Sequence, residues 1–269
     1  MKKIGIFIIF LVLLPEFCPA GVRVIGSLTR EKTAGPGETY EEAILLMNSE
    51  ETPCEVKVYQ TDYTFFCDGR NMYGEPGHEA RSNAGWLMLN PNRLIIPPHE
   101  KASVYYRLEV PEDAHLTGTY WSMVMVEQIP ATSPESIVCR ENDKITMSLQ
   151  TVIRYGIQII TNIGDTGIRK IRFLDKKLIS LDGKKIFRID IENIGDRSLS
   201  PSLWAELYNR EGRSIGRFDG RKARIYPGCS IRNDLELAGV KPGTYKTLVV
   251  VDNGDDHIFG AQYDLEIGE

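Results

Sequence analysis

The stretch ITMSLQTVIRYGIQI, Ile145–Ile159, lies near the middle of the chain and indicates the fold class. Over its first half, apolar Ile145, Met147 and Leu149 alternate with polar side chains. Successive side chains of a β-strand point to opposite faces, so this alternation predicts a strand with one buried face. The stretch is long for a strand and carries a single cation, Arg154, among uncharged neighbours.

Similar short runs recur along the chain, set apart by Gly, Pro, Asn and Asp. No window shows a sustained apolar period of 3.6 residues, so the sequence predicts an all-β protein. Besides Ile145–Ile159, the expected strands are Tyr40–Asn48, Cys54–Phe66, Trp86–Leu89, Ala102–Val110, Thr119–Gln128, Ile168–Leu174, Lys185–Glu192, Leu203–Tyr208, Ser214–Phe218, Ser230–Leu237, Thr244–Val251 and Ile258–Ile267.

The two halves of the chain share a pattern. The same features follow in the same order in Arg93–Glu127 and in Ala223–Asp252. They are an Arg, a Pro turn, an expected strand ending in Leu-Glu-Val or Leu-Glu-Leu, and Gly-Thr-Tyr at the start of the next expected strand. Upstream, a strand in each half ends in an asparagine, Asn48 or Asn193. This weak repeat predicts two tandem immunoglobulin-like β-sandwich domains, residues 21–161 and 162–269.

A tyrosine enters the corresponding strand of each half, at Tyr120 and Tyr245. In immunoglobulin-like sandwiches such a tyrosine can form a corner, its hydroxyl donating to the backbone a few residues upstream. The alternative is an aromatic side chain packed near a turn without that hydrogen bond.

The first 20 residues are expected to be a secretory signal peptide. Lys2 and Lys3 precede the apolar run Ile4–Leu14, and the small-residue exit Cys18-Pro19-Ala20 follows. The run is short for a bilayer span, which needs about 20 residues. A lipoprotein signal with lipidated Cys18 is the alternative, although Pro15-Glu16-Phe17 lacks small residues before it. We therefore expect export to the periplasm or cell surface, with no membrane span in the mature chain.

Neither charge nor motifs indicate nucleic-acid binding or catalysis. The 32 basic and 37 acidic residues are intermixed, which gives a formal net charge of −5 and no basic face. VDNGDDHIF, Val251–Phe259, lacks the ligand spacing of a calcium loop and is better interpreted as an Asn-Gly hairpin. No serine or cysteine stands in a known nucleophile context. The histidines lie in separate predicted turns: His78, His99, His115 and His257. We expect no enzyme, no cofactor and no metal.

Several segments together resemble the periplasmic pilus chaperones of the PapD type, exported proteins of two immunoglobulin-like domains. PGETYEEAILLMNSEETPCEVKVYQTDY, residues 36–63, resembles their opening strands, and LIIPPHEKASVYYRLEVP, residues 94–111, resembles their Pro turn and following strand. SLQTVIRYGIQI, residues 148–159, resembles the last strand of their first domain. The resemblance implies a non-enzymatic chaperone that completes a secreted pilus or surface subunit by β-strand addition, and an outer-membrane assembly platform as a further partner.

The same resemblance implies which residues bind the partner. Ile145, Met147 and Leu149 would supply the alternating apolar side chains, although buried sandwich core is the alternative for them. Two cations would anchor the terminal carboxylate of the subunit. By position these are Arg154 on the last strand and Lys32, or else Arg30, on the first. A lysine would bind a carboxylate without the bidentate geometry of arginine.

One segment departs from the chaperones. The insertion FFCDGRNMYGEPGHEARSNAGW, residues 65–86, more closely resembles the WxL-interacting proteins of Gram-positive surface complexes. That weaker resemblance implies a structural or adhesive module of a cell-envelope complex, which is the alternative function.

The cysteines beyond the signal peptide are Cys54, Cys67, Cys139 and Cys229. An even number in an oxidising compartment allows full pairing. Cys54 and Cys139 are expected at one end of the sandwich, so a Cys54–Cys139 disulfide is the preferred prediction. The alternative is that all four remain reduced.

Overall fold

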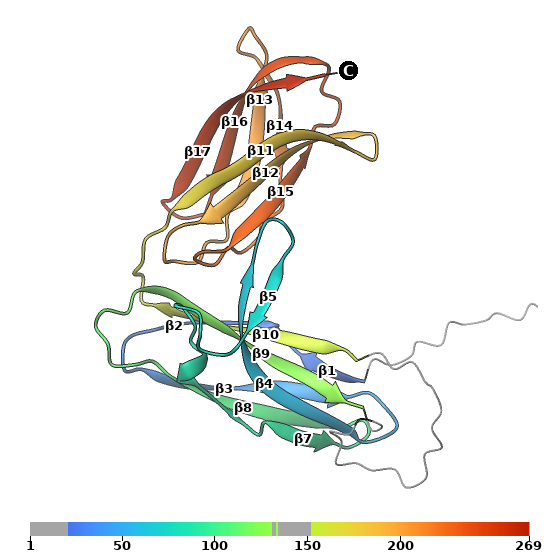
Figure 1. Cartoon of the computed structure of the whole chain (residues 1–269), viewed down its shortest axis with the longest axis vertical. Helices are drawn as coiled ribbons and strands as arrows, with labels where there is room; N and C mark the ends of the chain where they lie inside the picture. The colour runs from blue at the N-terminus through green and yellow to red at the C-terminus, as the bar shows by residue number, and fades with distance from the viewer. Residues whose placement is uncertain (1–20, 131–132, 134–151, 269) are drawn as a thin grey trace, which may run out of the picture.

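The computed structural model describes residues 21–130, 133 and 152–268, and its strands form two domains, drawn one above the other in Figure 1. No helix among these residues is long and apolar enough to cross a membrane. The first domain contains β1 (Val22–Ile25), β2 (Thr29–Ala34), β3 (Thr39–Asn48), β4 (Cys54–Phe65), β5 (Asn71–Gly74), η1 (Ala84–Trp86), β6 (Leu87–Asn90), β7 (Arg93–Ile96), β8 (Lys101–Glu109), β9 (Gly118–Ile129) and β10 (Arg154–Ile163).

The first domain is a sandwich of two sheets, with strand orders β1-β3-β8-β6 and β2-β10-β9-β4-β5, and β7 also pairs with β4. Its core is apolar side chains that alternate along the strands, such as Val56 and Val58 on β4 and Ile157 and Ile159 on β10. All strand pairs here are antiparallel except β2 with β10, which run parallel. The start of the chain therefore contributes to both sheets, β1 to one and β2 to the other.

The second domain is also a sandwich. Its strands are β11 (Ile171–Leu181), β12 (Lys184–Asn193), β13 (Ser202–Tyr208), β14 (Ser214–Asp219), β15 (Ser230–Glu236), β16 (Gly243–Asp252) and β17 (Ile258–Ile267). They form the sheets β11-β12-β15 and β14-β13-β16-β17. The prediction of an all-β chain with two immunoglobulin-like sandwiches is confirmed. The Asn-Gly hairpin is present as well, because β16 and β17 are antiparallel neighbours joined at Asn253–His257.

The predicted strand at Ile145–Ile159 differs from the structure. Strand β10 begins only at Arg154 and continues to Ile163, while Val152 and Ile153 precede it without strand structure. Ile145, Met147 and Leu149 lie outside the described residues. Alternation did not predict β1, β2, β5 and β7, which are short or polar strands, and only the chaperone resemblance placed Arg30 and Lys32 on a first strand, which is β2.

The two asparagines of the repeat occupy equivalent, fully buried positions. The amide nitrogen of Asn48 donates to the carbonyl oxygen of Ile96 at 3.0 Å, and that of Asn193 donates to Ile225 at 3.0 Å. Each amide nitrogen also donates to the carbonyl oxygen of the residue four positions later. A buried carbonyl without a partner is costly, so these amides hold the turn after β3 and the turn after β12 against the next segment of each sandwich.

Only one of the two expected tyrosine corners forms. The hydroxyl of Tyr245 donates to the carbonyl oxygen of Lys241 at 2.9 Å, as the corner requires. Tyr120 instead packs its ring against Trp86, with centroids 4.6 Å apart, so the packed-aromatic alternative applies there.

We predict that Asn193→Ala lowers the free energy of unfolding by about 3 kcal/mol, because it removes the side-chain hydrogen bonds to the carbonyl oxygens of Arg197 and Ile225 and the acceptor of the Gly195 N–H. The matched control is Asn233→Ala. Asn233 is equally buried, but its side-chain amide has no hydrogen-bond partner within the described part of the chain, so its loss should cost about 1 kcal/mol or less. Equal losses in chemical denaturation would show that the asparagine hydrogen bonds do not stabilise the turn.

Candidate functional site

Strand β10 has an edge that is covered along only part of its length. Strand β2 pairs with Gln158–Ile163, and the Gln158 N–H donates to the carbonyl oxygen of Leu28 at 2.8 Å. Backbone groups alternate sides along a strand, so the N–H groups of Gly156 and Arg154 point to the same side as that of Gln158. Among the described residues, no strand pairs with β10 there, which leaves an open edge at Arg154–Ile157.

Arg154 lies at the start of this open edge on the outer face of the sheet. Its Nε is 2.8 Å from Glu127 Oε2 and its Nη2 donates to Glu127 Oε1 at 3.2 Å, a two-pronged ion pair with the neighbouring strand. Glu127 is buried and also accepts from the Tyr59 hydroxyl at 2.9 Å. The Arg154 side chain nevertheless remains 60% exposed, so its guanidinium can reach a second acceptor.

Lys32 does not join Arg154 at a common site. Lys32 lies opposite Thr161, near the far end of β10, and its Nζ is 2.9 Å from Glu42 Oε1. Cross-strand neighbours share a face, and Thr161 is on the opposite face of β10 from Arg154 because its position differs from that of Arg154 by seven, an odd offset. The structure therefore does not bring Arg154 and Lys32 together, and their joint binding of a carboxylate stays a prediction. Arg30 lies opposite Ile159 on that same inner face, and its Nε is buried with no hydrogen-bond partner within the described chain.

The residue that β2 presents to the second domain is an acid, Glu31. Its carboxylate accepts from Arg224 Nη2 at 2.7 Å and from Asn162 Nδ2 at 2.8 Å. The hydrogen bond from Arg224 contributes most to lowering the pKa of Glu31 below its ordinary value, against the opposing effect of burial. This contact between the domains was not expected from the sequence.

Aromatic stacking joins the two domains. The rings of Trp121 on β9 and Tyr226 stack with centroids 4.6 Å apart and an interplanar angle of 8°. The Tyr226 hydroxyl donates to Gln158 Oε1 at 2.5 Å, and Phe65 packs edge-on against the same ring at 5.9 Å. Burial raises the pKa of Tyr226. Trp121 and Ile160 consequently belong to one continuous apolar cluster with the core of the second domain.

The insertion that departs from the chaperone pattern provides a further contact between the domains. Strands β4 and β5 form a hairpin that extends toward the second domain (Figure 1). At its tip the Cys67 N–H donates to Ser230 Oγ at 3.0 Å. The carbonyl oxygen of Tyr63 accepts from Trp121 Nε1 at 2.7 Å, which fixes the indole that stacks on the second domain.

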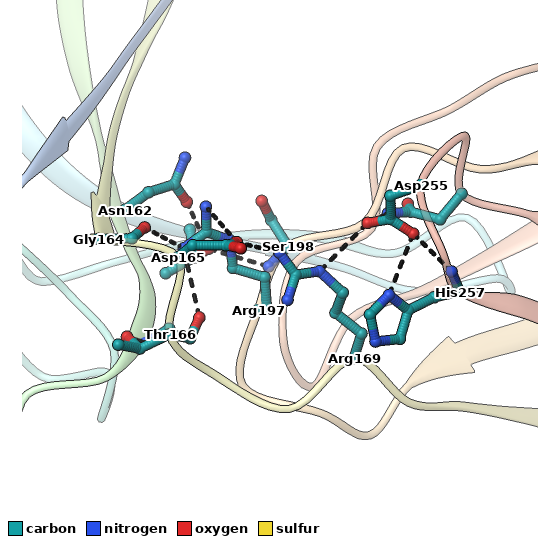
Figure 2. Close-up of polar contacts among 12 residues, drawn as sticks. Asn162, Gly164, Asp165, Thr166, Arg169, Arg197, Ser198, Asp255 and His257 are labelled. Carbon is teal, nitrogen blue, oxygen red and sulfur yellow. Dashed lines mark hydrogen bonds and ion pairs between the residues drawn. The ribbon is translucent and has the colours of Figure 1, made fainter.

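Polar contacts hold the connection between the domains, as Figure 2 shows. Arg197 Nη1 donates to the carbonyl oxygen of Gly164 at 2.8 Å. Arg169 pairs with Asp165, and its Nε lies 3.2 Å from Asp255 Oδ2 in the β16–β17 turn. The connecting segment is therefore bonded to the second domain at several points, which restrains the angle between the domains.

A cavity of about 800 Å³ lies between the hairpin tip, β10 and the second domain. Arg224 and Arg232 in its lining are already paired, with Glu31 and with Asp190 at 2.7 Å. The cavity is lined by both aromatic and charged side chains. Its lining includes Tyr63, Phe65, Phe66 and Tyr226 beside Arg221, Arg224, Arg232, Asp68 and Asp234.

Cys54, one partner of the predicted Cys54–Cys139 disulfide, is a buried free thiol in this structure, and the pairing stays a prediction. Its Sγ donates to Asn48 Oδ1 at 3.2 Å, and burial together with Glu50 raises the pKa of the thiol to about 12. Cys139 lies outside the described residues. Cys67 and Cys229 are free as well. Within the described ranges, no group of three or more His, Cys, Asp or Glu side chains could hold a metal ion.

Comparisons with known proteins agree with this architecture. No protein-family model matches the sequence, and no curated protein does. Among solved structures, the chain is similar to the class 5 fimbriae chaperone CfaA, at 13% identity and a TM-score of 0.50, over 93% of this chain and 100% of that one. It is also similar to a chain of a CFA/I fimbriae chaperone–tip adhesin complex, at 11% identity and a TM-score of 0.48, over 91% of this chain and 98% of that one. A chain of the CsuC–CsuE chaperone–subunit complex of Acinetobacter baumannii is similar at 11% identity and a TM-score of 0.45, over 91% of this chain and 98% of that one.

The similarity to CfaA shows that this chain has the two-domain fold of a fimbriae chaperone. The resemblance to pilus chaperones seen in the sequence is thus confirmed at the level of fold. At 13% identity the comparison does not assign a role to any residue.

We predict that Trp121→Ala loosens the contact between the domains. The substitution removes the stack on Tyr226, should cost about 3 kcal/mol, and should broaden the distribution of interdomain distances in small-angle X-ray scattering. Trp204→Ala is the control, because Trp204 packs under Arg217 on the second domain, 4.3 Å from the guanidinium to the ring centroid. An unchanged scattering profile for Trp121→Ala would mean that other contacts set the angle.

The Glu31–Arg224 contact should depend on pH. Because the folded pKa of Glu31 lies below the ordinary value of 4.5, its ionised form stabilises the protein above pH 4.5, and this contribution is lost as the pH falls through the folded pKa. The difference in unfolding free energy between wild type and Glu31→Gln should therefore be largest near neutral pH and shrink below pH 4.5. A difference that stays constant between pH 7 and pH 3 would exclude this linkage.

Proposed function

We propose that the protein is an exported, non-enzymatic chaperone that binds secreted pilus or surface subunits by accepting a partner strand at the open edge of β10. The observation that carries this proposal is the edge at Arg154–Ile157, which no strand of the described residues covers. Backbone hydrogen bonds along such an edge supply affinity, and alternate side chains supply register. The fold that the chain shares with a fimbriae chaperone supports the same role.

The surroundings of the edge favour a partner over free exposure to water. Val152 and Ile153, which precede β10, are 40% and 41% exposed, and Leu28, which lies beside Gln158, is 42% exposed. An open strand edge with apolar neighbours tends to pair with another strand. Ile145, Met147 and Leu149 lie outside the described residues, so the proposal rests on Arg154–Ile157. In this role the protein acts in the periplasm or at the cell surface, and an assembly platform in the outer membrane is a second partner.

The test compares two substitutions at one position. Gly156→Pro removes the N–H that faces the open edge, whereas Gly156→Ala keeps it. Both place a Cβ against the side chain of Met123, so that contact is common to the two variants. Each full-length variant is purified from the periplasm or medium of its own host, and the accompanying proteins are identified by mass.

We predict that small β-rich secreted subunits accompany wild type and Gly156→Ala, and that Gly156→Pro binds them at least about tenfold more weakly. In the complex, the Arg154 and Gly156 amides should become protected from hydrogen exchange. If the same proteins bind all three forms without this protection, the edge is not the binding site, and the structural or adhesive module becomes the better explanation.

A further inference from the structure

The outer face of the sheet beside the open edge is built in rows across three strands. The register places Arg154 beside Glu127 and Lys57, and Gly156 beside Met125 and Tyr59, along β10, β9 and β4. Side chains in one row lie on the same face and are within contact distance of each other. The first row is therefore charged and the second is apolar.

A groove of about 390 Å³ lies over the apolar row and extends to the next one. Met123 and Met125 in it are buried, whereas Tyr59 and Tyr73 are exposed. Methionine side chains adapt their shape to an incoming apolar group, and tyrosine rings add contact area at low entropic cost. The lining residues are Tyr59, Thr61, Tyr73, Met123, Met125, Arg154 and Gly156.

Gly156 leaves the groove accessible from the open edge. A glycine presents no side chain across its row, so a residue on a strand added beside it can extend over the β10 backbone. A Cβ at Gly156 would collide with Met123 Sδ, which shows that the methionine side chain lies directly against the glycine. A long apolar side chain on the added strand would thus contact Met123, as cross-strand partners of glycine do in stabilised sheets.

The charged row lies two residues away on the same face. Glu127 is 2.8 Å from Arg154 Nε and 3.5 Å from Lys57 Nζ, so two cations share one buried carboxylate. The exposed guanidinium of Arg154 can accept a further acidic partner without leaving Glu127.

From this arrangement we propose that the β10 edge selects partner strands with an acidic residue opposite Arg154 and a large apolar residue opposite Gly156. These two partner residues are separated by one position, because Arg154 and Gly156 are themselves separated by one. The inference rests on the proposed function and deepens it, since it states the chemistry of the strand that the same edge accepts. The occupant of the groove is the large apolar side chain of that strand.

The test uses synthetic nine-residue strand peptides as probes, with the full-length protein. One peptide carries Leu-Thr-Glu-Thr-Leu at its centre, so that Leu can lie opposite Gly156 and Glu opposite Arg154 in either strand direction. A second peptide has Ala in place of both Leu residues, and a third has Gln in place of Glu. Wild type should bind the first peptide about tenfold more tightly than either of the others. Gly156→Val places a side chain between the added strand and the groove, so it should remove the preference for the Leu peptide over the Ala peptide and leave the other preference unchanged. Arg154→Gln should remove only the preference for the Glu peptide over the Gln peptide.

Hydrogen exchange at the Arg154 and Gly156 amides separates the two levels of the proposal. Protection by the peptides together with equal affinities for all three would overturn the selectivity and leave strand addition intact. An absence of protection with every peptide would overturn strand addition at this edge, and the selectivity with it. Preferences that survive both Gly156→Val and Arg154→Gln would place recognition elsewhere on the protein.

Discussion

The parallel pairing of β2 with the second half of β10 is the constraint on which the rest of the structure depends. Strand β2 covers Gln158–Ile163 and brings the start of the chain into the sheet that faces the second domain. The same pairing places Glu31 where Arg224 can reach it. The pairing does not extend to Arg154–Ile157, and no other described strand covers that side of β10. One short strand therefore both closes part of the sheet and leaves the rest of the edge open.

One sheet of the first domain has an outer face with two different regions. Toward Ile163, the outer face of β10 and β9 is covered by the second domain through Trp121, Ile160 and Tyr226. Toward Arg154, the same face carries the charged row and the methionine groove. The aromatic stack, the β4–β5 hairpin and the bonded connecting segment hold the second domain at one end. The other end of the sheet is thereby kept accessible.

Much of the fold could be predicted from the sequence, because strands with one face toward the core alternate apolar and polar residues, as β17 (Ile258–Ile267) does from Phe259 onward. The alternation pattern did not predict strand β2, TREKTA, since an edge strand needs no apolar side chain on either face, and only the resemblance to pilus chaperones placed Arg30 and Lys32 on a first strand. The pairing of Arg154 with Glu127 was hidden for a similar reason, because cross-strand neighbours are set by register and not by proximity in sequence. The contact between domains was missed because Phe65 and Tyr226 lie far apart in the chain.

The free thiols of Cys54 and Cys229 have a chemical consequence. Burial raises the pKa of Cys229 to about 11, and that of Cys54 is about 12. At neutral pH only about one in 10⁴ to 10⁵ of these groups is a thiolate, and the thiolate is the form that attacks a disulfide. Folded molecules should therefore exchange disulfides very slowly at these two positions. Buried Cys54 and Cys229 should therefore form mixed disulfides with other thiols much more slowly than an exposed cysteine does.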